Sequence, residues 1–308
     1  MRHHAAIMET DDIAHGFYGR SGGVSTGIFT SLNCGPGSDD APDAIYENRA
    51  RVVKNLSGAE HPLITLHQVH SPDVVTVTAP WEDRNGRPRA DAMVTRLRNI
   101  ALGILTADCC PILLADHDTG VIGAVHAGWR GALAGVIPNT IKAMRDIGAK
   151  VANIRAAIGP TIQQSSYEVG ADVRDAFTNA NSANTKFFIP SPCHPRGGEA
   201  EPGDPRSRNT NVSSSGANGL PNHGSPGSAA TASAPRMTSE GSKYLFDLPG
   251  FAAHQLMQSN VQIYENLGMD TYPAANDFFS YRRGTHENDN APIGGGNYGR
   301  QISAIILR

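Results

Sequence analysis

The sequence is short of cysteine, long apolar runs and basic clusters, and each shortage excludes a class of protein. Four cysteines in 308 residues are too few and too irregular for a disulfide framework, so we expect thiols in a reducing compartment. The longest apolar runs, such as residues 100–105, are far below the roughly 20 residues that span a bilayer. The chain has 26 Lys and Arg against 29 Asp and Glu, which argues against general binding to nucleic acids.

The remaining composition is that of a soluble globular protein. Hydrophobic residues make up 39% and charged residues 18% of the chain, whose net charge is −3. Glu9, Asp11 and Asp12 stand where a signal peptide would need an apolar core, so we expect a cytoplasmic protein. The length allows one large domain or two modest ones.

Residues 194–243 differ in composition from the rest of the chain. They contain 8 Gly, 6 Pro and 9 Ser, with Val212, Leu220 and Met237 as the large apolar residues. Such a segment buries too little surface to offset its ordering entropy. We predict one domain over 1–308 that carries a Gly/Pro/Ser-rich disordered insertion at 194–243.

The hydrophobic pattern predicts an α/β protein of the α+β type. Short, mostly continuous apolar runs are typical of strands buried on both faces. The expected strands are 63–66, 74–78, 92–95, 100–105, 112–115, 121–125 and 302–307. The expected helices are 131–147, in which Pro138 predicts a kink or a late start, 171–179 and 247–259. Because strands and helices do not alternate regularly, packed sheets are favoured over a doubly wound fold.

Three segments place chemically active side chains at strand ends. These are TLHQVH at 65–70, TADCCP at 106–111 and VHAGWRG at 125–131. If the three ends adjoin, two imidazoles and a thiolate come together, which suits Zn²⁺, or Cu²⁺ if the geometry allows, and leaves an open coordination position. Taken singly, each histidine is more often a structural residue and a buried cysteine a small hydrophobe. No HExxH or paired CxxC motif supports the metal from spacing alone.

These segments resemble the laccase-domain family, also called the multicopper polyphenol oxidase or YfiH-like family, whose members are described as purine nucleoside phosphorylases. The pairing of TADC-x-P with HAGWRG is the most specific part of the resemblance. The resemblance extends along the chain on both sides of the predicted insertion, at residues 31–35, 157–162, 167–169 and 278–283. The resemblance implies a single domain of packed mixed β-sheets flanked by helices.

The resemblance also implies the metal ligands. It places zinc on His70, Cys109 and His126, with Cys109 chosen over Cys110 because it directly follows the aspartate of the ADC motif. Zinc can lower the pKa of bound water toward about 7, and a proton carrier is still needed. Asp108 is the candidate for that role, and its alternative is to orient a ligand histidine through a hydrogen bond.

Four polar residues match motif positions that the resemblance associates with substrate. Asn33 and Arg49 are expected to hold phosphate or ribose, and Gln68 and Arg130 lie in the same motif neighbourhoods. Structural roles stay open beside these: Asn33 can cap a turn, and either arginine can pair with a carboxylate. His67 receives no assignment.

The resemblance therefore implies a zinc-dependent purine nucleoside phosphorylase acting on inosine, adenosine or guanosine with phosphate. Adenosine deaminase and methylthioadenosine phosphorylase side activities are expected with it. The alternatives are a copper-dependent polyphenol oxidase, a hydrolase in which Cys109 is the nucleophile beside a histidine base, a peptidoglycan-editing factor, and a protein in which the metal is purely structural.

Overall fold

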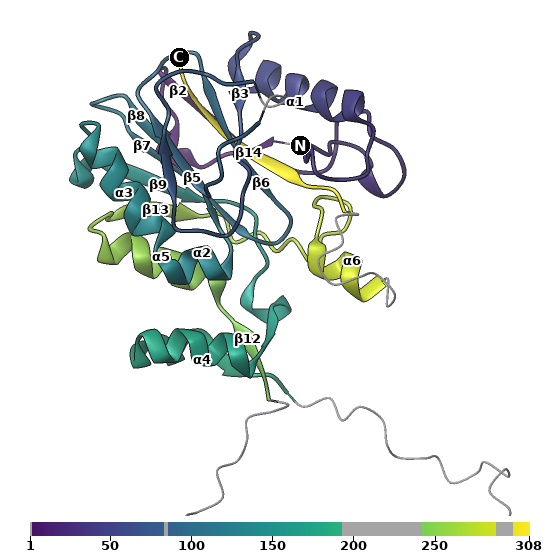
Figure 1. Cartoon of the computed structure of the whole chain (residues 1–308), viewed down its shortest axis with the longest axis vertical. Helices are drawn as coiled ribbons and strands as arrows, with labels where there is room; N and C mark the ends of the chain where they lie inside the picture. Colours follow the sequence, from purple (N-terminus) through teal and green to yellow (C-terminus); the bar gives the residue numbers. More distant parts are fainter. Residues whose placement is uncertain (1, 83–85, 193–241, 288–297) are drawn as a thin grey trace, which may run out of the picture.

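The chain folds into three β-sheets flanked by helices, as described by a computed structural model for residues 2–82, 86–192, 242–287 and 298–308 (Figure 1). The five-stranded sheet has the order β1 (Arg2–His3), β2 (Ile13–Tyr18), β14 (Gln301–Leu307), β6 (Ala101–Thr106) and β3 (Leu63–Ile64). The six-stranded sheet has the order β13 (Ile263–Asn266), β9 (Ile154–Ile158), β7 (Cys110–Asp116), β8 (Val121–Ala127), β5 (Ala92–Thr95) and β4 (Val74–Thr76). The small sheet has the order β10 (Glu168–Gly170), β12 (Lys243–Phe246) and β11 (Phe188–Pro190).

Helices cover the outer faces of the two larger sheets. The α-helices are α1 (Pro42–Ser57), α2 (Trp129–Ala134), α3 (Val136–Asp146), α4 (Ala171–Ala180), α5 (Leu248–Gln258) and α6 (Tyr281–Glu287). Short 3₁₀ helices lie at Ala6–Met8, Gly27–Phe29, Val151–Asn153, Gln164–Ser166 and Ser182–Phe187. Helix α1 packs on the five-stranded sheet, and α2, α3 and α5 pack on the six-stranded sheet (Figure 1).

The continuous apolar runs are explained by burial of both faces of each sheet. In β7, Cys110, Ile112 and Leu114 face the helices, whereas Leu113 and Ala115 face the five-stranded sheet. This alternation follows from the two-residue period of a strand. A fully buried two-sided strand needs apolar residues at every position, so the expectation of packed mixed sheets is confirmed.

Most predicted elements are present, with changed ends. Strand 92–95 matches β5, the runs at 100–105, 112–115, 121–125 and 302–307 lie in β6, β7, β8 and β14, and β3 and β4 are shorter than predicted. The single helix at 131–147 was wrong. Gly135 adopts a φ of 95° and divides it into α2 and α3, so α3 starts two residues before Pro138.

Helix α1 was missed because its buried stripe is not uniformly apolar. The buried positions recur at helical spacing, but two of them, Asn48 and Arg49, are polar. The apolar periodicity that predicts an amphipathic helix is therefore interrupted in the middle. The helix starts with Pro42 at its first position and ends before Gly58, whose φ is 78°.

The predicted insertion at 194–243 falls almost entirely outside the described residues. Its last residue, Lys243, begins β12, so the predicted boundary was late at this end. Cys34, Cys109 and Cys110 are unpaired thiols, as expected, and Cys193 lies outside the described residues. Within the described part of the chain, no helix is both long enough and apolar enough to cross a bilayer.

Candidate metal centre

Three side chains from separate segments converge where β6 and β8 end and β7 begins. The ligand atoms of His70, Cys109 and His126 all lie within 4.8 Å of one another. His126 belongs to β8, Cys109 immediately precedes β7, and His70 lies in the loop between β3 and β4 with a φ of 61°. The rings of the two histidines meet edge to face with centroids 4.7 Å apart. Two imidazoles and one thiol at this spacing can hold a metal that prefers nitrogen and sulfur ligands, with a fourth position left for another group.

Gly128 makes this convergence possible. A Cβ atom at position 128 would overlap the imidazole of His70 and would lie 3.2 Å from Sγ of Cys109. The backbone entering α2 thus passes directly against two of the three ligands. The glycine of the HAGWRG segment is explained by this close approach.

Asp91, which lies outside the three motif segments and was not predicted as a site residue, orients two of the ligands. Its Oδ1 lies 2.7 Å from Nδ1 of His126, which leaves Nε2 of that ring for a metal. Its Oδ2 accepts hydrogen bonds from the backbone N–H groups of Val69 and Ser71 at 3.1 and 2.6 Å, on both sides of His70. A carboxylate that fixes a ligand histidine in this way is typical of metal sites.

The electrostatics around the histidines differ because one of them faces acidic groups. Burial lowers the pKa of His70 to about 4, and neighbouring His126 adds to that effect. Burial also opposes the charge on His126, but the neighbouring side chains of Cys109 and Asp91 more than offset it and raise its pKa to about 9. Burial would raise the pKa of Asp91, yet the hydrogen bond from His126 and the two backbone donors lower it to about 2. A metal and a proton compete for the ring of His126, so a raised pKa makes metal affinity depend on pH.

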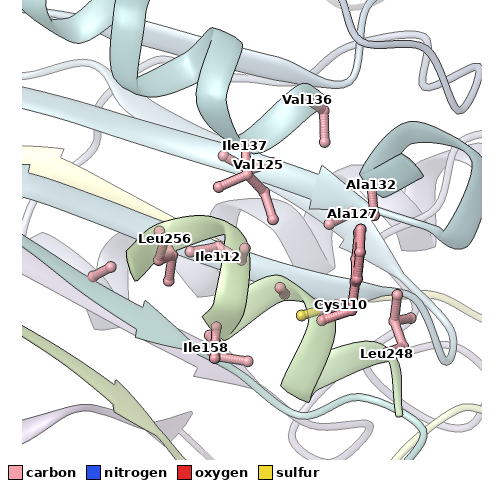
Figure 2. Close-up of a cluster of buried hydrophobic side chains, with 14 of the residues drawn as sticks. Cys110, Ile112, Val125, Ala127, Ala132, Val136, Ile137, Ile158, Leu248 and Leu256 are labelled. Carbon is pink, nitrogen blue, oxygen red and sulfur yellow. The ribbon is translucent and has the colours of Figure 1, made fainter. Parts of the chain in front are cut away.

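The adjacent cysteines face opposite sides of the strand. Cys109 is half-buried and lies in the ligand cluster, whereas Cys110 is fully buried in the core between β7, β8 and the helices. Figure 2 shows Cys110 among Ile112, Ala127 and Leu248. Burial raises the pKa of the Cys110 thiol. The choice of Cys109 as the ligand agrees with this geometry.

Asp108 is tied to the C-terminal part of the chain rather than to a ligand histidine. Its Oδ1 accepts a hydrogen bond from the Thr271 hydroxyl at 2.6 Å, and its Oδ2 accepts from the Ser280 hydroxyl at 3.0 Å and the Arg282 N–H at 2.7 Å. Burial raises its pKa, although these donors partly oppose the shift. The histidine-orienting role considered for Asp108 belongs to Asp91.

The metal cluster forms one wall of a pocket of about 320 Å³, within the size range of small-ligand sites. No carboxylate lines this pocket in the described part of the chain, but two arginines do. Its lining residues are Gly35, Pro36, Gly37, Leu66, His67, Gln68, His70, Arg87, Leu105, Thr106, Ala107, Cys109, His126, Tyr298 and Arg300. Arg87, Arg300 and Tyr298 were missed, since they lie outside the motifs that marked the site.

Asn33 does not present its side chain to the pocket. Its amide nitrogen donates to Ser38 Oγ and Asp40 Oδ2, both at 2.9 Å. Its Oδ1 accepts from the N–H groups of Gly35 at 3.1 Å and Arg300 at 2.9 Å. Two donors and two lone pairs are thereby used, which exhausts the capacity of an amide side chain. The turn-holding role left open for Asn33 is the one that the structure supports.

The other three residues predicted to bind substrate do not lie together in the pocket. Arg49 is buried in α1, donates to Thr65 Oγ1 at 3.0 Å, and lines a separate groove. Gln68 lines the pocket, but its amide pairs with both backbone groups of Leu105, at 2.7 and 2.9 Å. Arg130 is exposed and lies over the Trp129 ring at 4.9 Å. Only Gln68 therefore lies at the pocket, where it fixes the segment that carries His70.

The comparisons with known proteins give a consistent picture. The family model described as multi-copper polyphenol oxidoreductase laccase matches residues 14–197 and 222–308, and its gap falls inside the predicted insertion. A purine nucleoside phosphorylase of Streptomyces coelicolor is 44% identical over 167 residues, covering 54% of this chain and 69% of the relative. One of Rickettsia conorii is 30% identical over 265 residues, covering 86% and 85%.

A solved structure agrees over the whole chain. The crystal structure of a Neisseria meningitidis protein is 28% identical, has a TM-score of 0.71, and is matched over 100% of this chain and 98% of its own. The family match, the relative that is matched over most of its length and the shared fold agree with one another. They also agree with the clustering of the motif residues. The chain belongs to the multi-copper polyphenol oxidoreductase laccase family.

Proposed function

We propose that this protein is a purine nucleoside phosphorylase that holds a divalent metal, zinc by preference, on His70, Cys109 and His126. The observation that carries the proposal is the pocket itself, in which a metal-ligand cluster shares one cavity with two arginines and, among the described residues, with no carboxylate. Such a pocket attracts an anion. Relatives named purine nucleoside phosphorylase support phosphate as that anion.

The reaction needs a positioned phosphate and a purine leaving group. A phosphate oxygen forms a bond to C1′ of the ribose while the C1′–N9 bond breaks and its electron pair leaves with the purine. The proton of hydrogen phosphate ends on the purine, so the products are free base and ribose 1-phosphate. Fixing two reactants at the right distance contributes much of such a rate enhancement.

The chain's own residues would hold the metal ligands in place beside these reactants. Asp91 fixes the ring of His126 and the backbone on both sides of His70. Gln68 fastens the same loop to β6. When bound, the metal would supply a Lewis acid that polarises an oxygen or lowers the pKa of water. That chemistry also supports the proposed adenosine deaminase side activity, while the methylthioadenosine phosphorylase activity follows from the same phosphorolysis.

A copper-dependent polyphenol oxidase is the other candidate, and the family description favours it. Several coppers need several groups of ligands. In the described residues one group of three fits a metal. One such group supports the phosphorylase better than an oxidase with several coppers.

The test is a panel of inosine, adenosine and guanosine with the purified full chain, each with and without phosphate. We expect free base and ribose 1-phosphate only when phosphate is present, and loss of both after chelation. Base release without phosphate would point to a nucleosidase, and activity that survives chelation would point to Cys109 as a nucleophile. Oxidation of phenols with several coppers per chain would support the oxidase, and cleavage of muropeptides alone would support peptidoglycan editing.

A further inference from the structure

The two arginines of the pocket reach it from parts of the chain that carry no metal ligand. Arg300 directly precedes β14, and Arg87 lies between β4 and β5. Both line the same cavity as Cys109 and His126. The cavity is therefore bordered by the metal cluster and by two guanidinium groups.

The side chain of Arg300 is held in place along its whole length. Its backbone N–H donates to Asn33 Oδ1 at 2.9 Å. Its aliphatic part passes over Gly35, where a Cβ would lie 3.1 Å from the arginine Cβ and Cδ. Its guanidinium stacks on the ring of Tyr298, 4.4 Å from the centroid. Holding the side chain in this way reduces the entropy that the arginine loses when it binds a ligand.

The charge of Arg300 is not neutralised within the described residues. In the part of the chain that the structure describes, no carboxylate lies within ion-pair distance of Arg300 and none lines the pocket. Arg87 donates to the backbone carbonyl of Leu66 at 3.3 Å, which fixes its direction. A guanidinium group can donate two parallel hydrogen bonds to a tetrahedral oxyanion, so the held side chain of Arg300, with the second positive charge of Arg87 beside the same cavity, suits such an anion.

We propose that Arg300 and Arg87 form the subsite that binds the phosphate co-substrate, an inference that rests on the proposed function. The assignment replaces Arg49, which lines a different groove. Asn33 acts through Arg300 as a positioning residue, because the same Oδ1 holds the N–H groups of Arg300 and Gly35. The anion is inorganic phosphate, and the phosphate group of a nucleoside monophosphate is the other source that the test must separate.

The experiment uses the metal-loaded full chain and the variants Arg300→Gln, Arg300→Lys and Arg87→Gln. Arg51→Gln is the matched control, because Arg51 is an exposed arginine paired with Glu47 on α1. Calorimetric titration measures the Kd of inorganic phosphate and of inosine 5′-monophosphate. Steady-state kinetics measures KM for phosphate and for inosine separately.

Loss of a charge-assisted pair should raise the Kd and KM for phosphate about 10- to 100-fold in Arg300→Gln. KM for inosine should change by less than about threefold, on the expectation that the interaction is confined to the anion. Arg300→Lys should recover part of the loss because it keeps the charge but not the planar fork. Arg87→Gln should show the same selectivity, so the proposal stays testable if Arg300→Gln fails to fold. The control should match the wild type.

The possible results distinguish a failure of the phosphate subsite from a failure of the proposed function. Phosphate-dependent turnover with an unchanged phosphate KM in both glutamine variants would overturn the subsite and leave the function standing. Arginine-dependent phosphate binding without nucleoside cleavage would support the subsite and overturn the function. If the arginine variants weakened only inosine 5′-monophosphate, the subsite would belong to a nucleotide and the proposal would be wrong.

Discussion

Two buried aspartates flank the metal centre, and their surroundings give them opposite properties. Asp91 faces a histidine that can carry a proton, and its pKa is lowered to about 2 despite burial. Asp108 faces two hydroxyl groups and a backbone N–H, and burial raises its pKa. The first is coupled to the ligands, whereas the second joins the strand end that carries Cys109 to the C-terminal segment.

The comparison shows that proximity in sequence to a ligand does not determine a role. Asp108 adjoins Cys109, yet its hydrogen bonds lead to residues 271–282. Asp91 lies 35 positions from His126 and bonds it directly. We therefore assign the orientation of the metal ligands to Asp91. We propose that Asp108 holds the chain that carries Cys109 in position rather than transferring a proton.

The largest expected effect is on metal affinity in Asp91→Asn. The amide keeps the size of the side chain but cannot support the charge and tautomer of His126, so metal affinity should fall about 10- to 100-fold. Competition with a chelator of known affinity measures this. Asp146→Asn is the control, because Asp146 is an exposed partner of Lys142. Equal affinities in wild type and Asp91→Asn would show that Asp91 does not orient the ligand.

Asp108→Asn should mainly reduce stability. An amide nitrogen would face a group that now donates to a carboxylate oxygen, so the free energy of unfolding should fall by about 1 to 3 kcal/mol. Urea unfolding checks this, with metal content and kcat measured on the folded fraction. A loss of kcat of about 100-fold or more in a stable, metal-loaded variant would instead identify Asp108 as a proton carrier.

The pH dependence of stability in the metal-free protein should show the Asp91–His126 pair. The lowered pKa of Asp91 contributes stability that is present above about pH 4 and lost as the pH falls through about 2. The raised pKa of His126 contributes stability that is present below about pH 6.5 and lost as the pH rises through about 9. The difference in unfolding free energy between wild type and Asp91→Asn should therefore peak between these limits, at about 2 kcal/mol. A difference that does not vary with pH would contradict the ion pair.

The smallest effect is expected from deleting residues 197–240, which lie far from both aspartates in sequence. Pro190 pairs with Tyr244 across β11 and β12, so a short connection can join the two strands. Loop-closure entropy varies only slowly with length. Activity and melting temperature should stay near those of the full chain in matched assays. A large loss of stability would show that the deleted segment packs against the domain.

The sequence predicts those features that depend on local pattern. Strand alternation separates Cys109 from Cys110, and strand ends that adjoin bring two histidines and a cysteine together. The family resemblance, rather than the spacing, identified these as His70, Cys109 and His126, which lie in one cluster. Asp91 could not be found in this way, because it precedes β5 and only the pairing of β5 with β8 brings it to His126.

Long-range pairing also explains the errors in the substrate residues. Arg300 reaches the pocket because β14 pairs with β6 across nearly 200 positions of sequence. Asn33 matches a motif position, but all the hydrogen bonds of its side chain go to neighbouring protein groups rather than into the pocket. A motif identifies a position that matters, and the hydrogen bonds of the folded chain decide whether it contacts a ligand.

The central claim is that one metal binds at His70, Cys109 and His126, and the adjacent cysteines test it most directly. Metal content per chain should be measured in freshly purified wild type, Cys109→Ser and Cys110→Ser. We predict about one metal per chain in wild type and in Cys110→Ser, whose cost is a packing defect of about 1 to 3 kcal/mol, and little or none in Cys109→Ser. Full metal content in Cys109→Ser, or its loss in Cys110→Ser alone, would contradict the account.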